Sequence, residues 1–116
     1  MPSFSRGDVV LVRYPFSDLS GTKVRPAVVV SPPYPSNDLL IVPMTSRIAG
    51  LRPGEFLLND WASAGLRVPT AIKRGVHTTH IRLIATTVGR LSPKDLGDLA
   101  SSLRQWLSLE STGPDL

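Results

Sequence analysis

Residues 7–31 read GDVVLVRYPFSDLSGTKVRPAVVVS, and this stretch decides the fold. Two valine-rich runs, Val9–Val12 and Ala27–Val30, stand at its ends and are separated by a mostly polar segment. Such runs, bounded by Gly, Pro, Ser and Asp, are typical of strands, and their spacing favours a hairpin with a long loop. The loop Phe16–Lys23 exceeds the length of a tight turn and carries an aromatic ring, hydroxyls and a lysine. We therefore predict that it contacts a ligand.

The first expected strand is apolar on both faces. Val9 and Leu11 alternate with Val10 and Val12, so each face carries aliphatic side chains. This pattern predicts a strand covered on two sides, as in a small closed barrel or at a subunit contact. Pro26 cannot donate a hydrogen bond to a ladder, so we expect Arg25 to mark the beginning of the second strand.

The rest of the chain predicts shorter strands and then one helix. Breaker residues bound further apolar runs, which we expect to form strands at Leu39–Met44, Glu55–Leu58, Val68–Lys73 and Ile81–Leu91, with a helical turn at Asn59–Ala64. The sequence Ser-Pro-Lys-Asp at 92–95 starts a helix, since serine caps well and proline is tolerated at the first position. Apolar residues then recur at helical spacing from Leu96 to Leu107. This order predicts a mainly β fold, a small β-barrel with a C-terminal helix.

Length and composition bound the class of protein. The 116 residues fit one domain spanning 1–116, with the tail after residue 109 frayed. No cysteine is present, which excludes disulfides, thiol nucleophiles and Cys-based zinc sites and is typical of a reducing compartment. No apolar run approaches the roughly 18 residues of a membrane span. We expect a cytoplasmic protein that does not bind membranes.

The basic charge is concentrated in the middle of the chain. Residues 47–90 carry seven Lys and Arg against two acids, whereas residues 91–116 carry two against four. A polyanion could dock on such a middle segment, although small domains are often mildly basic for solubility alone. Charge by itself does not decide between the two interpretations.

Four motifs in order carry a resemblance to a known family. They are the opening stretch 7–31, VPMTS at 42–46, DW…GL…PT at 60–70 and VGRL at 88–91. Together they span roughly residues 7–107, and the chain resembles the PemK/MazF family of type II toxin–antitoxin toxins, which are endoribonucleases. The resemblance implies an SH3-like barrel that forms a homodimer, acts on single-stranded RNA such as mRNA, and is neutralised by a cognate antitoxin. Operator DNA would be contacted only through the antitoxin.

The chemistry that the residues allow agrees with this resemblance. An RNA 2′-OH can attack its neighbouring phosphate, so a protein need only align it, stabilise the added charge and manage protons. Arginine suits the charge and a hydroxyl adds a short donor, and Arg25 with Thr45-Ser46 supplies both if their strands are neighbours. In the family, the corresponding Arg and Thr are the catalytic pair, which makes Arg25 and Thr45 the catalytic candidates here. We expect RNA contacts from Phe16, Ser17, Lys23, Ser46, Arg47 and Lys73. No metal-binding or phosphate-loop motif is present, and we expect neither a metal nor a cofactor.

Alternatives remain at this point. Taken alone, Arg25 fits a solvated strand end and Thr45-Ser46 fits a turn, while Phe16 either stacks on a base or pins its loop. The segment Lys73–His80 departs from the family, and its histidines, His77 and His80, are either proton shuttles, an extension of an RNA groove or, as we favour, exposed variation. The rival functions are a non-enzymatic toxin resembling CcdB that poisons a topoisomerase, and an inactive RNA-binding module.

Overall fold

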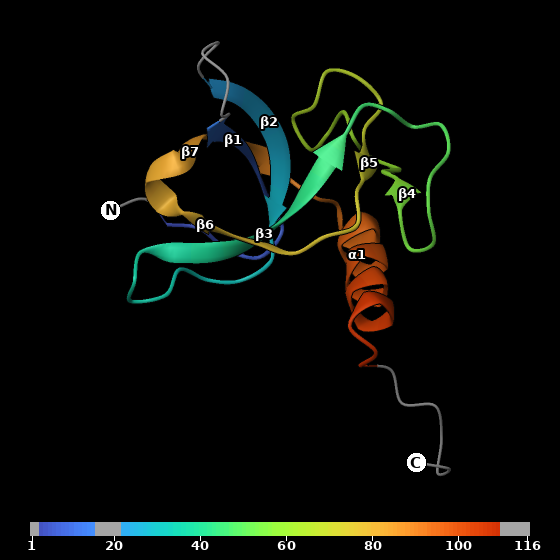
Figure 1. The fold of residues 1–116 in the computed structure, drawn as a ribbon. Coiled ribbons are helices and arrows are strands. Elements are labelled where there is room, and N and C mark those ends of the chain that lie inside the picture. The colour runs from blue at the N-terminus through green and yellow to red at the C-terminus, as the bar shows by residue number, and fades with distance from the viewer. Residues whose placement is uncertain (1–2, 16–21, 110–116) are drawn as a thin grey trace.

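The computed structural model describes residues 3–15 and 22–109, where the chain forms an antiparallel sheet with one α-helix at its end (Figure 1). Three eight-residue strands come first, β1 (Asp8–Pro15), β2 (Thr22–Val29) and β3 (Asp38–Thr45). Shorter strands follow, β4 (Phe56–Leu57), β5 (Ala71–Ile72), β6 (His77–His80) and β7 (Ile84–Arg90). The 3-10 helix η1 (Ile81–Leu83) precedes β7, and α1 (Pro93–Trp106) follows it.

The sheet is built outward from the predicted hairpin. β1 and β2 pair antiparallel, with Val9 opposite Val28 and Pro15 opposite Thr22, while residues 16–21 of their loop lie outside the described residues. The strand order is β4-β5-β3-β2-β1-β7, and β6 also pairs with β3. The mainly β fold with a C-terminal helix is therefore confirmed.

The sheet is not closed into a barrel, so the predicted SH3-like barrel is not confirmed. Closure requires every strand to have two neighbours. Among the described residues, β7 pairs with β1 alone and β4 with β5 alone. Figure 1 shows a strongly curved sheet in which β6 lies away from α1. The two-residue β4 is a poor closing strand, because it offers so few backbone groups to a partner.

Two apolar clusters cover the two faces of β1. The helix-side cluster contains Val9, Val28 and Val42 and is completed by Leu99 of α1. The second cluster, which we call the concave-face cluster, consists of Val10, Val12, Ala27, Val29, Leu39 and Ile41, with side chains of η1 and β7 packed against it. Coverage of β1 on two sides is thus achieved within one chain. The apolar pattern of β1 therefore gives no argument for a dimer.

Prolines interrupt the ladder between β2 and β3. Pro26 lies inside β2 rather than at its start, because β2 already begins at Thr22, so the expected start at Arg25 is wrong. Pro26 is tolerated there because β2 pairs with β3 only from Ala27 to Val29. On the other strand Pro43 stands opposite Ala27 and also lacks a backbone N–H. The two strands therefore lose their pairing at the end where Arg25 and Thr45 lie.

The other edge of β3 is paired by two strands with a bulge between them. Ile72 of β5 lies opposite Met44, and His77 of β6 lies opposite Ile41, so four residues lie between these two positions where β3 has only two. Gly75 has a φ of 146°, which favours glycine. The bulge 73–76 therefore projects from the sheet beside the C-terminal end of β3.

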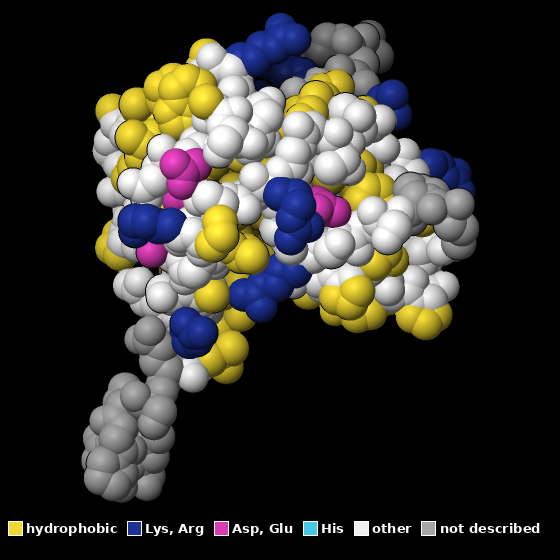
Figure 2. Space-filling model, turned by 180° about the vertical axis from the view of Figure 1, so that it is seen from behind, with side chains coloured by type: hydrophobic (Ala, Val, Ile, Leu, Met, Phe, Trp, Pro, Cys, Tyr) yellow, Lys and Arg dark blue, Asp and Glu magenta, His cyan; other side chains and the backbone are white. Residues whose placement is uncertain are grey.

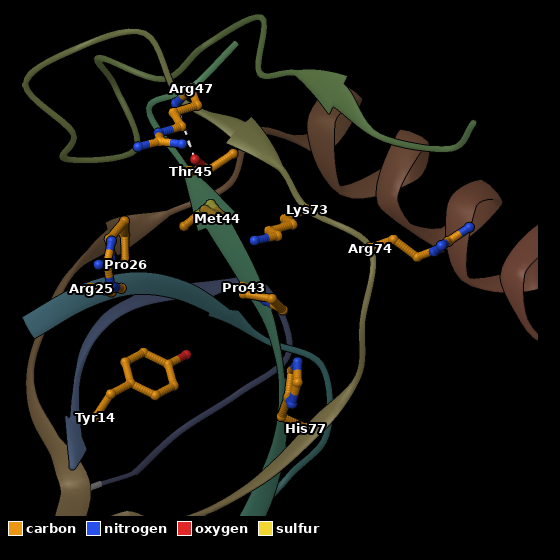
Figure 3. Close-up of a pocket in the computed structure, with 10 residues that line it drawn as sticks. All are labelled: Tyr14, Arg25, Pro26, Pro43, Met44, Thr45, Arg47, Lys73, Arg74 and His77. Atoms are coloured by element: carbon orange, nitrogen blue, oxygen red, sulfur yellow. Dashed lines mark hydrogen bonds between the residues drawn. The ribbon is translucent and has the colours of Figure 1, made fainter. Parts of the chain in front are cut away.

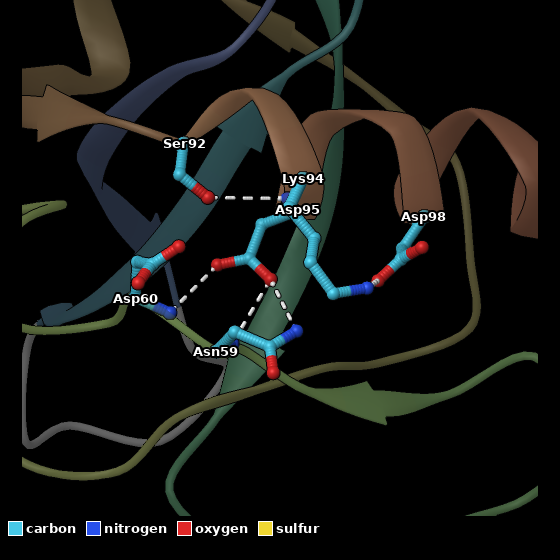
Figure 4. A network of polar contacts seen from close by, with 6 residues as sticks. All are labelled: Asn59, Asp60, Ser92, Lys94, Asp95 and Asp98. Atoms are coloured by element: carbon cyan, nitrogen blue, oxygen red, sulfur yellow. Dashed lines mark hydrogen bonds and ion pairs between the residues drawn. The ribbon is translucent and has the colours of Figure 1, made fainter.

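The predicted start of α1 is confirmed in detail (Figure 4). Ser92 is the N-cap, and its hydroxyl accepts a hydrogen bond from the Asp95 backbone N–H at 3.2 Å. Asp95 is fully buried and accepts hydrogen bonds from the backbone N–H groups of Asn59 and Asp60, each at 2.9 Å. This carboxylate joins the helix to the chain segment that follows β4. No helix of the described residues has the length and hydropathy to cross a membrane.

Candidate functional site

A groove of about 700 Å³ opens where β1, β2 and β3 end beside the bulge (Figure 3). Ten of the described residues line it: Tyr14, Arg25, Pro26, Pro43, Met44, Thr45, Arg47, Lys73, Arg74 and His77. Four of these carry a full positive charge and none is acidic. The groove is therefore suited to an anionic ligand.

The strand registers bring Arg25 and Thr45 to one face of the sheet. Val12 pairs with Arg25, so the Arg25 side chain leaves β2 on the same face as Val12 of the concave-face cluster. The β2–β3 register ends with Ala27 opposite Pro43, and Arg25 and Thr45 each lie two residues beyond that pair on their strands. The expectation that the two strands are neighbours is confirmed. Both residues line the groove.

A local turn fixes the Thr45 hydroxyl. Its oxygen accepts a hydrogen bond from the backbone N–H of Arg47 at 3.0 Å, as Figure 3 shows. The hydroxyl proton is left for a ligand, because the threonine oxygen has accepted and not donated. Thr45 is thus held as a donor at the end of β3.

Within the part of the chain that the structure describes, no ion pair joins a cation of the groove to a carboxylate. Ion pairs of the described residues join Arg90 to Asp8 and Lys94 to Asp98, and neither pair lies in the groove. Seen from the side opposite Figure 1, Lys and Arg side chains are scattered among apolar and polar ones (Figure 2). A second hollow of about 470 Å³ continues the groove past Arg47, Lys73 and Arg74 toward Arg52 and Glu55.

Glu55 holds the backbone of this continuation. Its carboxylate accepts hydrogen bonds from the backbone N–H groups of Arg74 at 2.8 Å and Arg52 at 2.7 Å. These bonds, with that from Arg74 the strongest influence, lower the pKa of Glu55. The Glu55 carboxylate therefore joins the backbones of two loops, and we call this contact the Glu55 clamp.

Tyr14 contributes a hydroxyl that sequence reasoning missed. Its oxygen is buried and has no hydrogen-bond partner among the described residues. Burial raises the pKa of Tyr14, and the nearby charge of Arg25 opposes this only in part. The signal was present in the sequence, since Tyr14 follows Val12 by two residues and shares its face.

The structure groups some of the predicted residues and separates others. Arg25, Thr45, Arg47 and Lys73 line the groove, whereas the exposed Ser46 and Lys23 are not among the lining residues. Phe16 and Ser17 lie outside the described residues.

The two histidines have different surroundings. His77 is exposed, as the favoured interpretation of Lys73–His80 expected, yet it lines the groove together with Arg74. His80 instead caps η1, where its Nδ1 accepts a hydrogen bond from the Arg82 backbone N–H at 3.0 Å. The described residues contain no cluster of three or more His, Asp or Glu side chains that could hold a metal ion. The available chemistry is that of cations and hydroxyls.

Solved structures share the whole fold. A MazE–MazF complex from Deinococcus radiodurans is 19% identical, with a TM-score of 0.74, and the match covers 91% of this chain and 96% of that one. An endoribonuclease in complex with its cognate antitoxin from a Mycobacterial species is 16% identical, with a TM-score of 0.68 and the same coverages. The Mycobacterium tuberculosis toxin MazF-mt6 is 17% identical, with a TM-score of 0.65, and the match covers 88% and 99% of the two chains. At these identities the likeness establishes the fold alone.

The sequence itself matches a known family, which the likeness in fold does not establish. No curated protein matches the chain significantly. The family described as PemK-like, MazF-like toxins of type II toxin–antitoxin systems matches residues 5–107, which is most of the chain. The four motifs, the fold and this match agree, and the chain belongs to the PemK-like, MazF-like toxin family of type II toxin–antitoxin systems.

Proposed function

We propose that this toxin is a metal-independent, sequence-selective endoribonuclease that cleaves single-stranded RNA in the groove. The observation that carries the proposal is the placement of Arg25 and Thr45 on one face of a groove where the described lining residues include four cations and no carboxylate. A phosphodiester supplies the missing negative charge, and arginine binds phosphate oxygens through a planar fork.

The reaction needs only groups that the RNA, the groove and water supply. The 2′-oxygen attacks the adjacent phosphorus and gives its proton to water, while the bond from phosphorus to the 5′-oxygen breaks and that oxygen takes a proton from water. The products are a 2′,3′-cyclic phosphate and a 5′-hydroxyl. Arg25 stabilises the charge that develops on the phosphorane, and the Thr45 hydroxyl adds a neutral hydrogen bond to it. Arginine contributes more, because its hydrogen bond is charge-assisted.

The partners follow from the same proposal. The toxin acts in the cytoplasm on mRNA and is neutralised by a cognate antitoxin that covers the groove, in line with the antitoxin complexes among the structural neighbours. Exposed Val76, Leu107 and Leu109 border an apolar hollow of about 340 Å³ and offer a contact surface for another protein chain, including a second copy of the toxin. The loop Phe16–Lys23 selects which bases are cut.

Cleavage of RNA by the purified protein in EDTA tests this function. We expect the wild type to leave 2′,3′-cyclic phosphate and 5′-hydroxyl ends, and Arg25→Ala to cut more slowly by about 10²–10³-fold. Arg25→Lys should recover little, because an ammonium group cannot form the fork. Arg13→Ala is the matched control, since Arg13 is exposed on β1 and does not line the groove.

Two results would contradict the mechanism. Cuts that leave 5′-phosphates would exclude attack by the 2′-OH, and folded Arg25→Ala protein with wild-type activity would remove Arg25 from the reaction. Binding of RNA without any cleavage would instead favour an inactive RNA-binding module.

A further inference from the structure

The Tyr14 hydroxyl is the polar group that the fold of one chain leaves unexplained. Its oxygen is buried without a hydrogen-bond partner among the described residues. Buried polar groups are nearly always paired, and an unpaired one destabilises the protein. A phenylalanine would fill the same space without this cost, because the Tyr14 ring itself packs against the concave-face cluster. The hydroxyl therefore requires a reason beyond packing.

The position of Tyr14 supplies that reason. Val12 pairs with Arg25 and Tyr14 with Lys23, so the tyrosine lies one alternation further along the same face as Arg25. Figure 3 shows its hydroxyl end pointing into the groove, away from β1. Tyr14 is one of the residues that line the groove, and the exposed side chains of Arg25 and His77 line it too. A ligand held by Arg25 therefore lies on the same side of the sheet as the Tyr14 hydroxyl.

Toward a phosphodiester Tyr14 acts as a donor, because the oxygens of a phosphodiester accept hydrogen bonds and do not donate them. Burial raises the pKa of the phenol, so it keeps its proton throughout the neutral range. Neighbouring Arg25 brings five N–H donors and no acceptor. A phosphodiester presents oxygens that accept hydrogen bonds from both residues, so it pairs the hydroxyl and the guanidinium at once.

We propose that Tyr14 is a further substrate-contacting residue, whose hydroxyl donates a hydrogen bond to an oxygen of the phosphate group held by Arg25. The inference rests on the proposed function and adds a third donor to Arg25 and Thr45. The bound RNA supplies the partner that the hydroxyl lacks in the free protein. Losing the hydroxyl should consequently weaken RNA binding and cleavage while leaving the free protein at least as stable.

Tyr14→Phe tests this inference, because it removes only the hydroxyl. The matched control is Tyr34→Phe, since Tyr34 is 43% exposed in the turn before β3 and lies outside the groove. Three quantities are measured for both variants and the wild type. They are the melting temperature, the single-turnover rate on an RNA oligonucleotide between pH 6 and 9, and the Kd for its uncleavable 2′-deoxy counterpart.

We expect Tyr14→Phe to melt at or above the wild-type temperature and to lose about tenfold in affinity, and hence about tenfold in the single-turnover rate below saturation, as removal of one hydrogen bond would give. The loss should be the same at every pH, because the donor does not titrate there. Tyr34→Phe should match the wild type in all three measurements.

The outcomes separate this inference from the proposed function. If the wild type cleaves RNA and Tyr14→Phe cleaves and binds equally well, the role of Tyr14 is overturned and the nuclease stands. A loss confined to high pH would overturn it in favour of a phenolate base. A lower melting temperature with unchanged activity would show that the hydroxyl serves the fold. If the wild type neither binds nor cleaves RNA, both proposals fail.

Discussion

Asp95→Ala should destabilise the protein more than any surface substitution on the same helix. Asp95 is 0% exposed, and its carboxylate accepts three hydrogen bonds, from the backbone N–H groups of Asn59 and Asp60 at 2.9 Å each and from the Asn59 side-chain amide at 3.2 Å. A hydrogen bond to a charged group contributes roughly 1.5–3 kcal/mol. Because Asn59 and Asp60 are exposed residues, water replaces part of what is lost. We expect a net loss of about 3 kcal/mol of unfolding free energy.

Thermal and urea unfolding of the variant measure this loss. For a chain of this size, about 3 kcal/mol corresponds to a fall in melting temperature of roughly 10 °C. Asp98→Ala is the matched control, because Asp98 lies on the same helix and forms an exposed pair with Lys94 at 3.2 Å. That pair contributes about 0.5 kcal/mol. If the two variants unfold together, the carboxylate of Asp95 does not join α1 to the sheet and the reasoning is wrong.

Two further predictions concern the backbone around the sheet and the groove. Gly65→Ala should destabilise the fold by about 2 kcal/mol or more, because Gly65 has a φ of 92° and an added Cβ would collide with the carbonyl oxygen of Val88. The control is Gly97→Ala, where an added Cβ would meet nothing within 4 Å, so this variant should be neutral or stabilising in thermal unfolding. Glu55 has a lowered pKa in the folded protein, so its contribution to stability is present above the ordinary glutamate pKa and is lost as pH falls through the folded value. The wild type should therefore melt at a higher temperature than Glu55→Gln near neutral pH, and this difference in melting temperature should disappear in acid. A difference that stays constant with pH would show that the Glu55 carboxylate does not stabilise the two loops.

The local elements could be predicted from sequence because their causes are local. β1 and β2 follow from valine-rich runs, and α1 from the Ser92 cap and the leucine period, so these elements appear within a few residues of their expected places. β6 was missed because HTTH has no apolar alternation, and it is a strand only because β3 pairs with it. Likewise, the closed barrel was expected from the order of the elements and from the family resemblance, but closure depends on long-range pairing that β4 and β7 do not make among the described residues.

In the candidate site, too, local features could be predicted from the sequence and long-range ones could not. Arg25 and Thr45 were found by resemblance and by the chemistry of phosphate, and the register brings their strands together. Tyr14 was passed over because alternation places it on a face without saying whether that face is open or filled. The answer depends on where the concave-face cluster ends, which is a property of the curved sheet.

The groove exists because the prolines and the bulge that end the strand pairing also leave the reactive side chains of the groove accessible. Pro26 and Pro43 cannot donate backbone hydrogen bonds, so the β2–β3 ladder stops beside them and the concave face is left without apolar filling at that end. The bulge 73–76 then takes the chain off the edge of β3 at the same level and brings Lys73 and Arg74 to the opening. A regular sheet would have continued the apolar core to the ends of the strands. The interruptions instead leave Arg25, Thr45 and Tyr14 at the end of a rigid core, where groups that must hold a phosphate are fixed in place before it arrives.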